Sequence, residues 1–266
     1  MFLPGVLTYY GVLKLSDTVV GLLGITGLLG PLLSGFIMTA ITEGGASIRR
    51  WLRRIVLWRV GIQWYLFALI GQPVVMVLTT IIIRPGALES FQTPAPLSVL
   101  PYLSAFVFMV LIGGPLFEEP GWSGFAQPRL QQLHGPLVGG LILGSLWALW
   151  HLPGFLIPSE DLTDIPPRGT VLDFVVFALA LVGLRLVIMW VFNNTKGSVL
   201  MAILVHASWN TFYSAALIQL FPAASVLGSY LNLTIAAGAL SLLVVALTRS
   251  RLGYRKEEPQ LATAPT

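Results

Sequence analysis

Long apolar stretches alternate with short polar connections along most of the chain. A helix needs roughly 20 apolar residues to cross about 30 Å of hydrocarbon. Seven stretches have that length: 21–42, 64–84, 98–118 (or further), 136–156, 171–193, 198–220 and 225–247. Their apolar runs are uninterrupted, whereas the strands of a membrane barrel alternate apolar and polar residues. The pattern therefore predicts an all-α fold, a polytopic transmembrane helical bundle with seven spans.

Two further segments complete the predicted architecture. Residues 1–17 are apolar but short and contain Lys14, which favours an interfacial or half-spanning helix. In the connection 43–63, arginines alternate with Trp and Leu at helical spacing, which is typical of an amphipathic helix lying in the membrane plane. We expect residues 1–248 to form one membrane-embedded domain and 249–266 to be a disordered cytoplasmic tail.

Composition excludes a soluble protein. The chain is 56% hydrophobic and 10% charged, whereas a soluble domain has roughly a quarter charged residues. The net charge of +4 does not indicate a nucleic-acid partner, because the basic residues lie in juxtamembrane loops. Their concentration in 43–63 and after residue 248 instead places the C-terminus in the cytoplasm of a multi-pass cell-membrane protein. There are no cysteines, so thiolate metal sites are excluded.

A few ionisable residues fall inside the predicted spans. They are Glu118, Glu119, His151, Arg185 and His206. Such groups are expensive in lipid, so they usually face the protein interior and mark function. These five residues are therefore the first candidates for a site.

The spacing of these residues suggests that they meet. Glu118 lies 17 residues before Gly135 and His151 lies 16 residues after it, so a helical hairpin would bring them to one level, roughly 25 Å from the turn. His206 and Asn210 are four residues apart and share one helix face. Three helices would then bring a carboxylate pair, two imidazoles and a carboxamide together.

Such a group can hydrolyse an amide in two ways. A buried glutamate takes a proton from water and returns it to the leaving amine, while His151 and Asn210 hold the water or stabilise an oxyanion. Alternatively, Glu118, His151 and His206 are enough ligands for a catalytic zinc, although the HExxH spacing is absent. Each residue also has a structural explanation. The histidines and Asn210 would be interhelical hydrogen-bonding residues, the glutamates the wet end of a span, and Trp147 a packing residue.

Three ordered motifs resemble one family. "EEPGWSGFAQPRL", "LWALWHLP" and "VLMAILVHASWN" are similar to the CPBP intramembrane proteases, the CAAX protease and bacteriocin-processing family, which includes the type II CAAX prenyl endopeptidases. The resemblance covers roughly residues 20–247. It implies that Glu118 activates water with support from Glu119, that His151 positions or ligates, and that His206 and Asn210 form the oxyanion site. A metal-dependent and a metal-free mechanism both remain open.

The sequence departs from the family pattern in its first two motifs. Ser123 stands where the first motif has an arginine that would orient a glutamate, and Trp147 stands where phenylalanine is usual. Arg185 or Arg129 is the candidate substitute for that arginine, although Arg185 could instead extend toward the inner interface. If the missing arginine weakens the enzyme, Ser123→Arg should raise its activity.

The sequence therefore favours an intramembrane endopeptidase that acts on a membrane-anchored protein or peptide. Ser123 motivates an alternative, a catalytically impaired membrane scaffold or bacteriocin-immunity protein. A small transporter with a proton relay is a third hypothesis, but the paired interrupted helices of transporters are not evident.

Overall fold

The computed structural model describes residues 3–95, 98–156, 171–222 and 227–255, and across these ranges the chain is helical without any strand. The helices of the N-terminal half are α1 (Leu3–Tyr9), α2 (Asp17–Leu28), α3 (Gly30–Glu43), α4 (Gly45–Ile55), α5 (Ile62–Leu66), α6 (Gln72–Ile83), α7 (Val99–Leu111), α8 (Pro115–Gly121) and α9 (Gln127–His134). They are followed by α10 (Pro136–Phe155), α11 (Val171–Asn194), α12 (Val199–Thr211), α13 (Ile218–Leu220) and α14 (Leu227–Leu247). Among the described residues, three π-helical segments interrupt this series: η1 (Phe67–Gly71), η3 (Trp122–Ala126) and η4 (Phe212–Leu217). The all-α prediction is confirmed.

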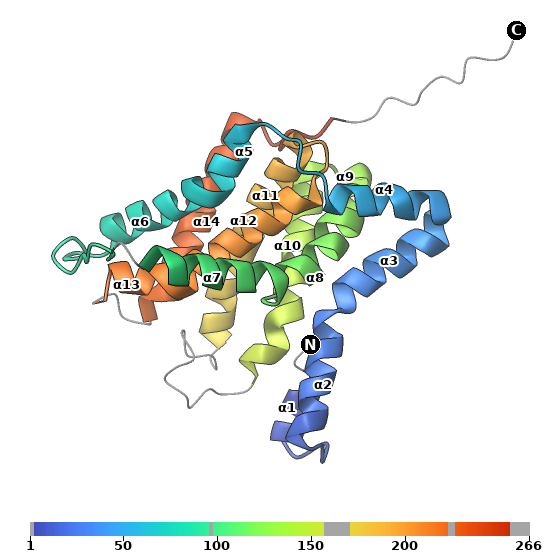
Figure 1. Cartoon of the computed structure of the whole chain (residues 1–266), viewed down its shortest axis with the longest axis horizontal. Helices are drawn as coiled ribbons and strands as arrows, with labels where there is room; N and C mark the ends of the chain where they lie inside the picture. The colour runs from blue at the N-terminus through green and yellow to red at the C-terminus, as the bar shows by residue number, and fades with distance from the viewer. Residues whose placement is uncertain (1–2, 96–97, 157–170, 223–226, 256–266) are drawn as a thin grey trace, which may run out of the picture.

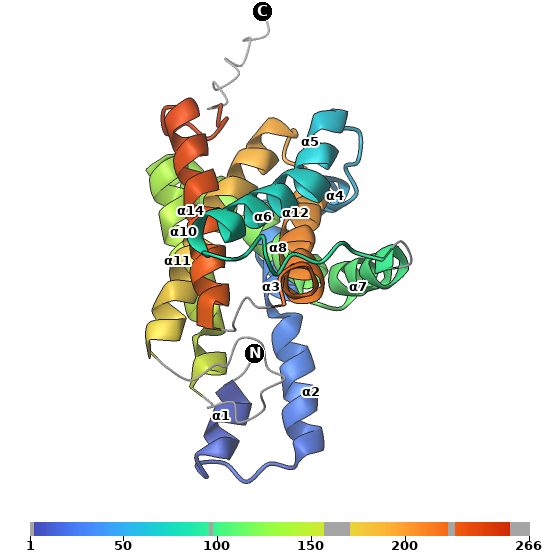
Figure 2. The ribbon, with the colours of Figure 1, turned by 90° about the vertical axis from the view of Figure 1, so that its left-hand side faces the viewer.

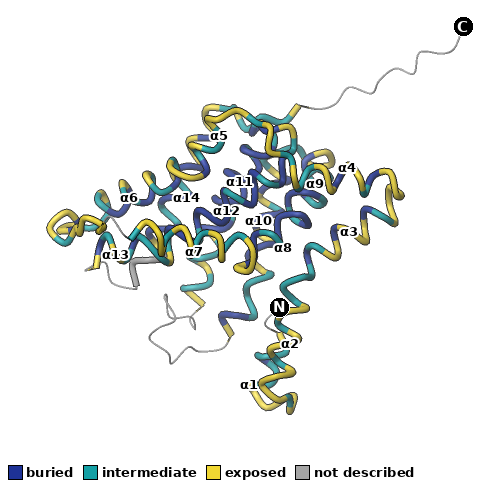
Figure 3. The backbone as a smooth tube through the Cα atoms, viewed as in Figure 1, coloured by how far each residue is buried: buried dark blue, intermediate teal, exposed yellow. Residues whose placement is uncertain are grey.

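Helix α11 lies at the centre of the bundle. It packs against α10 on one side and α14 on another, and it also contacts α12. Its buried residues Leu184, Val187 and Ile188 belong to the main apolar core. Helices α3 and α4 lie at one end of the molecule and α5 and α6 toward the other, while α1 and α2 extend away from the bundle (Figures 1 and 2). The most buried part of the chain is therefore the region where α8, α10, α11 and α12 meet (Figure 3).

The prediction of seven spans is not confirmed. Within the described residues, three helices are long and apolar enough to cross a membrane, namely Ile62–Ile83, Pro136–Phe155 and Val171–Asn194. Two bent pairs raise the number to five if each pair is one span: α2 with α3, bent by 45°, and α7 with the helices of Pro115–His134, bent by 40°. The predicted stretches 21–42 and 98–118 correspond to these pairs.

The last two predicted spans, 198–220 and 225–247, are not among the helices that qualify as membrane spans. The stretch 198–220 is helical from Val199 to Leu220, but its apolar residues are diluted by the polar groups around His206. The stretch 225–247 contains α14, of which Leu231–Leu247 is a shorter apolar helix, and residues 225–226 lie outside the described residues. The polar groups of the Val199–Leu220 stretch are tolerated in a membrane where they are buried inside the protein and not exposed to lipid.

Helix α4 accounts for the connection predicted to be amphipathic. Arg49, Arg50 and Arg53 are exposed on it, while Trp51 is buried and its indole N–H donates to the carbonyl of Pro120, at 3.1 Å. The basic face thus points outward and the aromatic face anchors α4 to α8. Of the predicted disordered tail 249–266, residues 256–266 lie outside the described residues.

Helices α3 and α8 touch backbone to backbone, which fixes the position of the two glutamates on α8. A Cβ placed on Gly121 would lie 2.2 Å from the carbonyl oxygen of Pro31, and a Cβ on Gly35 would lie 3.0 Å from the Cα of Gly121. Backbone atoms cannot move aside as a flexible side chain can. The sequence requires glycine here for close helix packing.

We therefore expect Gly121→Ala to lower the free energy of unfolding by about 1–3 kcal/mol or more, because the added methyl overpacks this crossing. Gly24→Ala is the matched control, since a Cβ on Gly24 of α2 meets nothing within 4 Å. Thermal unfolding in detergent measures both. Equal melting temperatures for the two variants would contradict the close approach of α3 and α8.

Candidate active site

Helix α8 places two adjacent glutamates in the interior of the bundle. Glu119 is fully buried and Glu118 is 6% exposed. Pro120 follows them, and because proline cannot donate the helical hydrogen bond, it disturbs a continuous α-helix. The chain continues as the π-helical segment η3, in which Ser123 is buried. The water-exposed position considered for this pair is therefore wrong.

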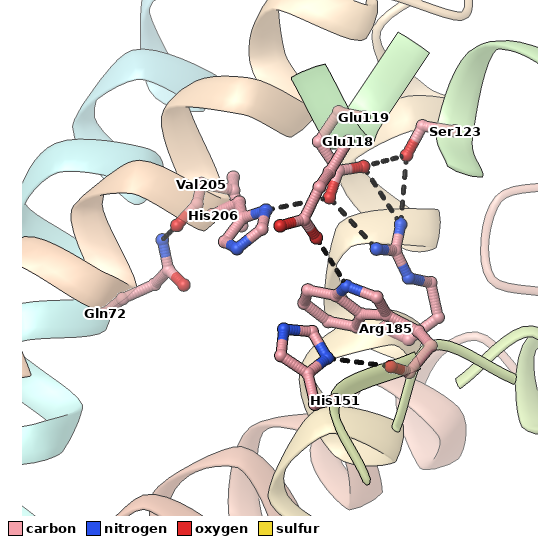
Figure 4. Close-up of polar contacts among 9 residues, drawn as sticks. Gln72, Glu118, Glu119, Ser123, His151, Arg185, Val205 and His206 are labelled. Atoms are coloured by element: carbon pink, nitrogen blue, oxygen red, sulfur yellow. Dashed lines mark hydrogen bonds and ion pairs between the residues drawn. The ribbon is translucent and has the colours of Figure 1, made fainter. Parts of the chain in front are cut away.

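The carboxylate of Glu119 is occupied on both oxygens. Arg185 of α11 donates from Nη2 to Oε1 at 2.9 Å and from Nη1 to Oε2 at 3.0 Å, a bidentate ion pair in which both side chains are fully buried. Ser123 donates its hydroxyl to Oε2. His206 of α12 lies with Nδ1 3.0 Å from Oε1. Figure 4 shows Glu119 between Arg185 and Ser123 on one side and His206 on the other.

This arrangement fixes the roles of the surrounding groups. A bidentate arginine pair holds Glu119 as an ionised acceptor, so Nδ1 of His206 carries the proton that it donates. Its second nitrogen, Nε2, then remains for other partners. Ser123 also accepts from Arg185 Nη1 at 3.1 Å, so the serine joins the ion pair instead of leaving a gap where the family motif has arginine.

The surroundings of Glu118 are different. Its Oε2 accepts one hydrogen bond, from the indole N–H of Trp147 on α10 at 2.7 Å. Among the described residues, no donor reaches its Oε1. Gly114 makes room for this oxygen, because a Cβ there would lie 2.8 Å from Oε1, and its φ of +117° favours glycine. Glu118 thus keeps one carboxylate oxygen available inside an otherwise closed polar cluster.

Trp147 links the two halves of the cluster, which sequence reasoning missed. Its ring lies beneath the Arg185 guanidinium, 4.3 Å from the ring centroid, and edge-on to His206, with ring centroids 4.9 Å apart. The indole N–H to Glu118 is a contact that phenylalanine, usual at this motif position, cannot make. That departure from the family pattern was the available signal.

His151 and Asn210 are not among the hydrogen-bond partners of the ion pair that the described residues show. His151 is half-buried on α10, with Nδ1 2.8 Å from the Trp147 carbonyl oxygen and its ring against Trp147 and Phe177. Asn210 is half-buried one turn after His206 on α12. The described residues give its side chain no hydrogen-bond partner. The direct contacts of the cluster therefore join Glu118, Glu119 and His206, with Arg185, Ser123 and Trp147 added.

Two residues were predicted to substitute for the motif arginine, and of these Arg185 is the one that contacts a glutamate of the pair. Its alternative position at the inner interface is wrong, because the side chain is buried and paired. Arg129 instead forms an ion pair with Glu43, where both side chains are partly exposed.

The suggested zinc ligands do not fit a metal centre. Within the described residues no group of three His, Asp or Glu side chains is arranged to hold a metal ion, so Glu118, His151 and His206 do not converge as a ligand set. His206 Nδ1 is taken by Glu119, and one oxygen of Glu118 is taken by Trp147.

The fold and the cluster together define a helical membrane protein with ionised and polar groups buried where four helices meet. Residues 100–212, which include all three motifs, match the family described as type II CAAX prenyl endopeptidase Rce1-like. The chain is also 23% identical over 200 residues to a protein of Methanococcus maripaludis named CAAX prenyl protease 2, covering 73% of each chain. The resemblance to the CPBP family that the motifs indicated is thereby confirmed.

Proposed function

We propose that this protein is an intramembrane endopeptidase in which Glu118 activates the water that attacks a peptide bond of a membrane-anchored substrate. The observation that carries the proposal is the unequal environment of two adjacent glutamates. Glu119 is held by Arg185, Ser123 and His206, whereas Glu118 keeps one oxygen free of donors within the described residues. One carboxylate is thus structural and the other is available for chemistry.

The proposed reaction uses these groups in sequence. Glu118 removes a proton from water as the oxygen attacks the carbonyl carbon, and a tetrahedral oxyanion forms. His206, held through Nδ1 by the Glu119 carboxylate, donates from Nε2 to that oxyanion when its ring carries both protons. Glu118 then returns the proton to the leaving nitrogen, and the C–N bond breaks to give a carboxylic acid and an amine.

Asn210, His151 and Trp147 have supporting roles in this proposal. Asn210 follows His206 by one turn on the same face of α12, and we place its amide with His206 in the oxyanion site. His151 donates from Nδ1 to the Trp147 carbonyl oxygen, and we assign to it the binding of the attacking water. Trp147 orients Glu118 through its indole N–H.

The substrate class is a membrane-anchored protein or peptide. The name of the Methanococcus relative points to a prenylated C-terminus, in which the cysteine of a C-terminal tetrapeptide carries the lipid. The test places the purified protein in vesicles with three peptides that share one sequence: one prenylated on this cysteine, one carrying a transmembrane anchor, and one soluble.

Cleavage of an anchored peptide in H₂¹⁸O, with one ¹⁸O in the new carboxyl group by mass spectrometry, is the expected result. Empty vesicles are the control. If all three peptides stay intact while an anchored peptide still binds, the protein is a scaffold, the alternative for which Ser123 was the motive. The Arg185–Glu119 pair removes that motive, because an arginine is present at the glutamate after all.

A further inference from the structure

Gln72, the first residue of α6, has an amide with one satisfied end and one unsatisfied end. Its side chain is fully buried, and Nε2 donates to the carbonyl oxygens of Ala68, at 3.1 Å, and Val205, at 3.2 Å. Carbonyl oxygens only accept, so the NH₂ group must face them and Oε1 must point elsewhere. Among the described residues, Oε1 has no hydrogen-bond partner although it is buried.

A buried acceptor without a hydrogen-bond partner lowers the stability of the fold. Leaving a buried polar atom without a partner destabilises a protein by about 1–3 kcal/mol, and within a membrane there is little bulk water to compensate. Because Val205 directly precedes His206, the bond to its carbonyl places the Gln72 amide beside the cluster. Figure 4 shows Gln72 on the His206 side of the site, away from Arg185.

The π-helical segments give an independent indication. Within the described ranges there are three, and two of them border the motifs: η3 begins just after the glutamate pair, and η4 begins just after the helix that carries His206 and Asn210. The third, η1, ends at Gly71, directly before Gln72. Such segments inside α-helices occur frequently at functional sites.

The hydrogen-bonding capacity of the site indicates what Gln72 would bind. A peptide held at the cluster presents backbone carbonyls and N–H groups, which need donors and acceptors once water is excluded. The two oxygens of Glu119 are already occupied, and the available oxygen of Glu118 is required for water. The carbonyl oxygen of Gln72 is therefore suited to a substrate N–H.

We propose that Gln72 Oε1 accepts a hydrogen bond from a backbone N–H of the substrate, next to the bond that is cut. This inference rests on the proposed endopeptidase function and adds a substrate-binding residue to it. Gln72 lies outside the segment 100–212 that matches the protease family, so the comparison assigns it no role.

The test combines a Gln72 variant with substrates that lack one N–H. Gln72→Met keeps the length of the side chain and removes its polar atoms, and Gln72→Leu replaces it if the methionine variant does not fold. Anchored peptides are made with one backbone amide at a time replaced by an ester, which removes the N–H without adding bulk. The scissile amide is left unchanged.

For wild type, one ester position should lower kcat/KM by about 10-fold, the effect of a lost hydrogen bond that leaves a buried acceptor unpaired. Gln72→Met should have a kcat/KM about 10-fold below that of wild type on the all-amide peptide. Replacing that same amide by an ester should then cause no further loss of kcat/KM in this variant. Thr80→Val is the matched control, because Thr80 lies on the same helix and its buried hydroxyl accepts from Asn232 at 2.6 Å. That variant should keep the full ester penalty.

Two results would overturn the inference. In the first, each ester that lowers kcat/KM for wild type lowers it equally for Gln72→Met. In the second, Gln72→Met has the kcat/KM of wild type on the all-amide peptide. Either result would mean that Gln72 only connects α6 to α12. Binding of the same peptides, measured by fluorescence anisotropy, separates this from a failure of the proposed function. If wild type binds the amide peptides without cutting them, the endopeptidase proposal fails, while about 10-fold weaker binding by Gln72→Met still supports Gln72 as a ligand of the peptide.

Discussion

Arg185→Leu is expected to lower kcat/KM by about 100-fold or more, because the arginine holds Glu119, and Glu119 in turn holds His206. Removing one partner of a buried ion pair leaves an uncompensated charge and costs about 3–5 kcal/mol. Displacement of catalytic groups by about 1 Å can lower a rate by 100-fold. The variant should therefore lose both stability and activity, which thermal unfolding and the cleavage assay measure.

The double variant Arg185→Leu/Ser123→Arg separates a specific role from general misfolding. It removes the guanidinium from α11 and supplies one from η3, four residues after Glu119, where the family motif has it. Leucine is shorter than arginine, so space remains for the new guanidinium. We expect the double variant to recover at least about 10-fold of the activity lost by Arg185→Leu, since the Glu119 ion pair is restored with changed geometry.

Ser123→Arg alone should have the opposite effect from the one that the sequence suggested. Ser123 is fully buried and already bonded to both Glu119 and Arg185. A second guanidinium would meet the first in a closed space, so activity should fall. If Ser123→Arg is more active than wild type, or the double variant is no better than Arg185→Leu, Arg185 is not the functional replacement of the motif arginine.

The parts of the fold that follow local rules were predictable from the sequence. Apolar length identified the helices Ile62–Ile83, Pro136–Phe155 and Val171–Asn194. The turn before α10 also lies where it was predicted, because Gly135 ends α9 with a φ of +77° and Pro136 begins the next helix. Apolar length could not reveal the bends within 21–42 and 98–118, because the number of apolar residues in a stretch does not determine the direction of its helix axis.

The site was predictable only in part for a similar reason. Depth in the membrane singled out Glu118, Glu119 and His206, which the structure brings together. Depth alone could not decide whether Arg185 or Arg129 meets Glu119, because that depends on how α11 is rotated about its axis. Trp147 was assigned to packing because its apolar ring dominates, while the contact that matters is made by one N–H at its edge.

Glu118→Gln is the second variant with a large expected effect. Glutamine has the same shape, and its amide oxygen can accept the indole N–H of Trp147 as Glu118 Oε2 does at 2.7 Å. It cannot remove a proton from water. We therefore expect kcat to fall by about 100- to 10,000-fold, the usual contribution of a general base, whereas the binding of an anchored peptide and the melting temperature should change little.

The matched control for this change is Glu43→Gln, which alters a partly exposed glutamate whose partner Arg129 lies outside the cluster. Exposed ion pairs contribute roughly 0–1 kcal/mol, so Glu43→Gln should cleave at the wild-type rate. Cleavage is followed under saturating peptide, because the proposal assigns Glu118 to the chemical step and not to binding. If Glu118→Gln keeps the kcat of wild type, or loses activity only through weaker binding, then Glu118 is not the base. The available oxygen beside Trp147 would then serve to hold the substrate, and another group would have to activate the water.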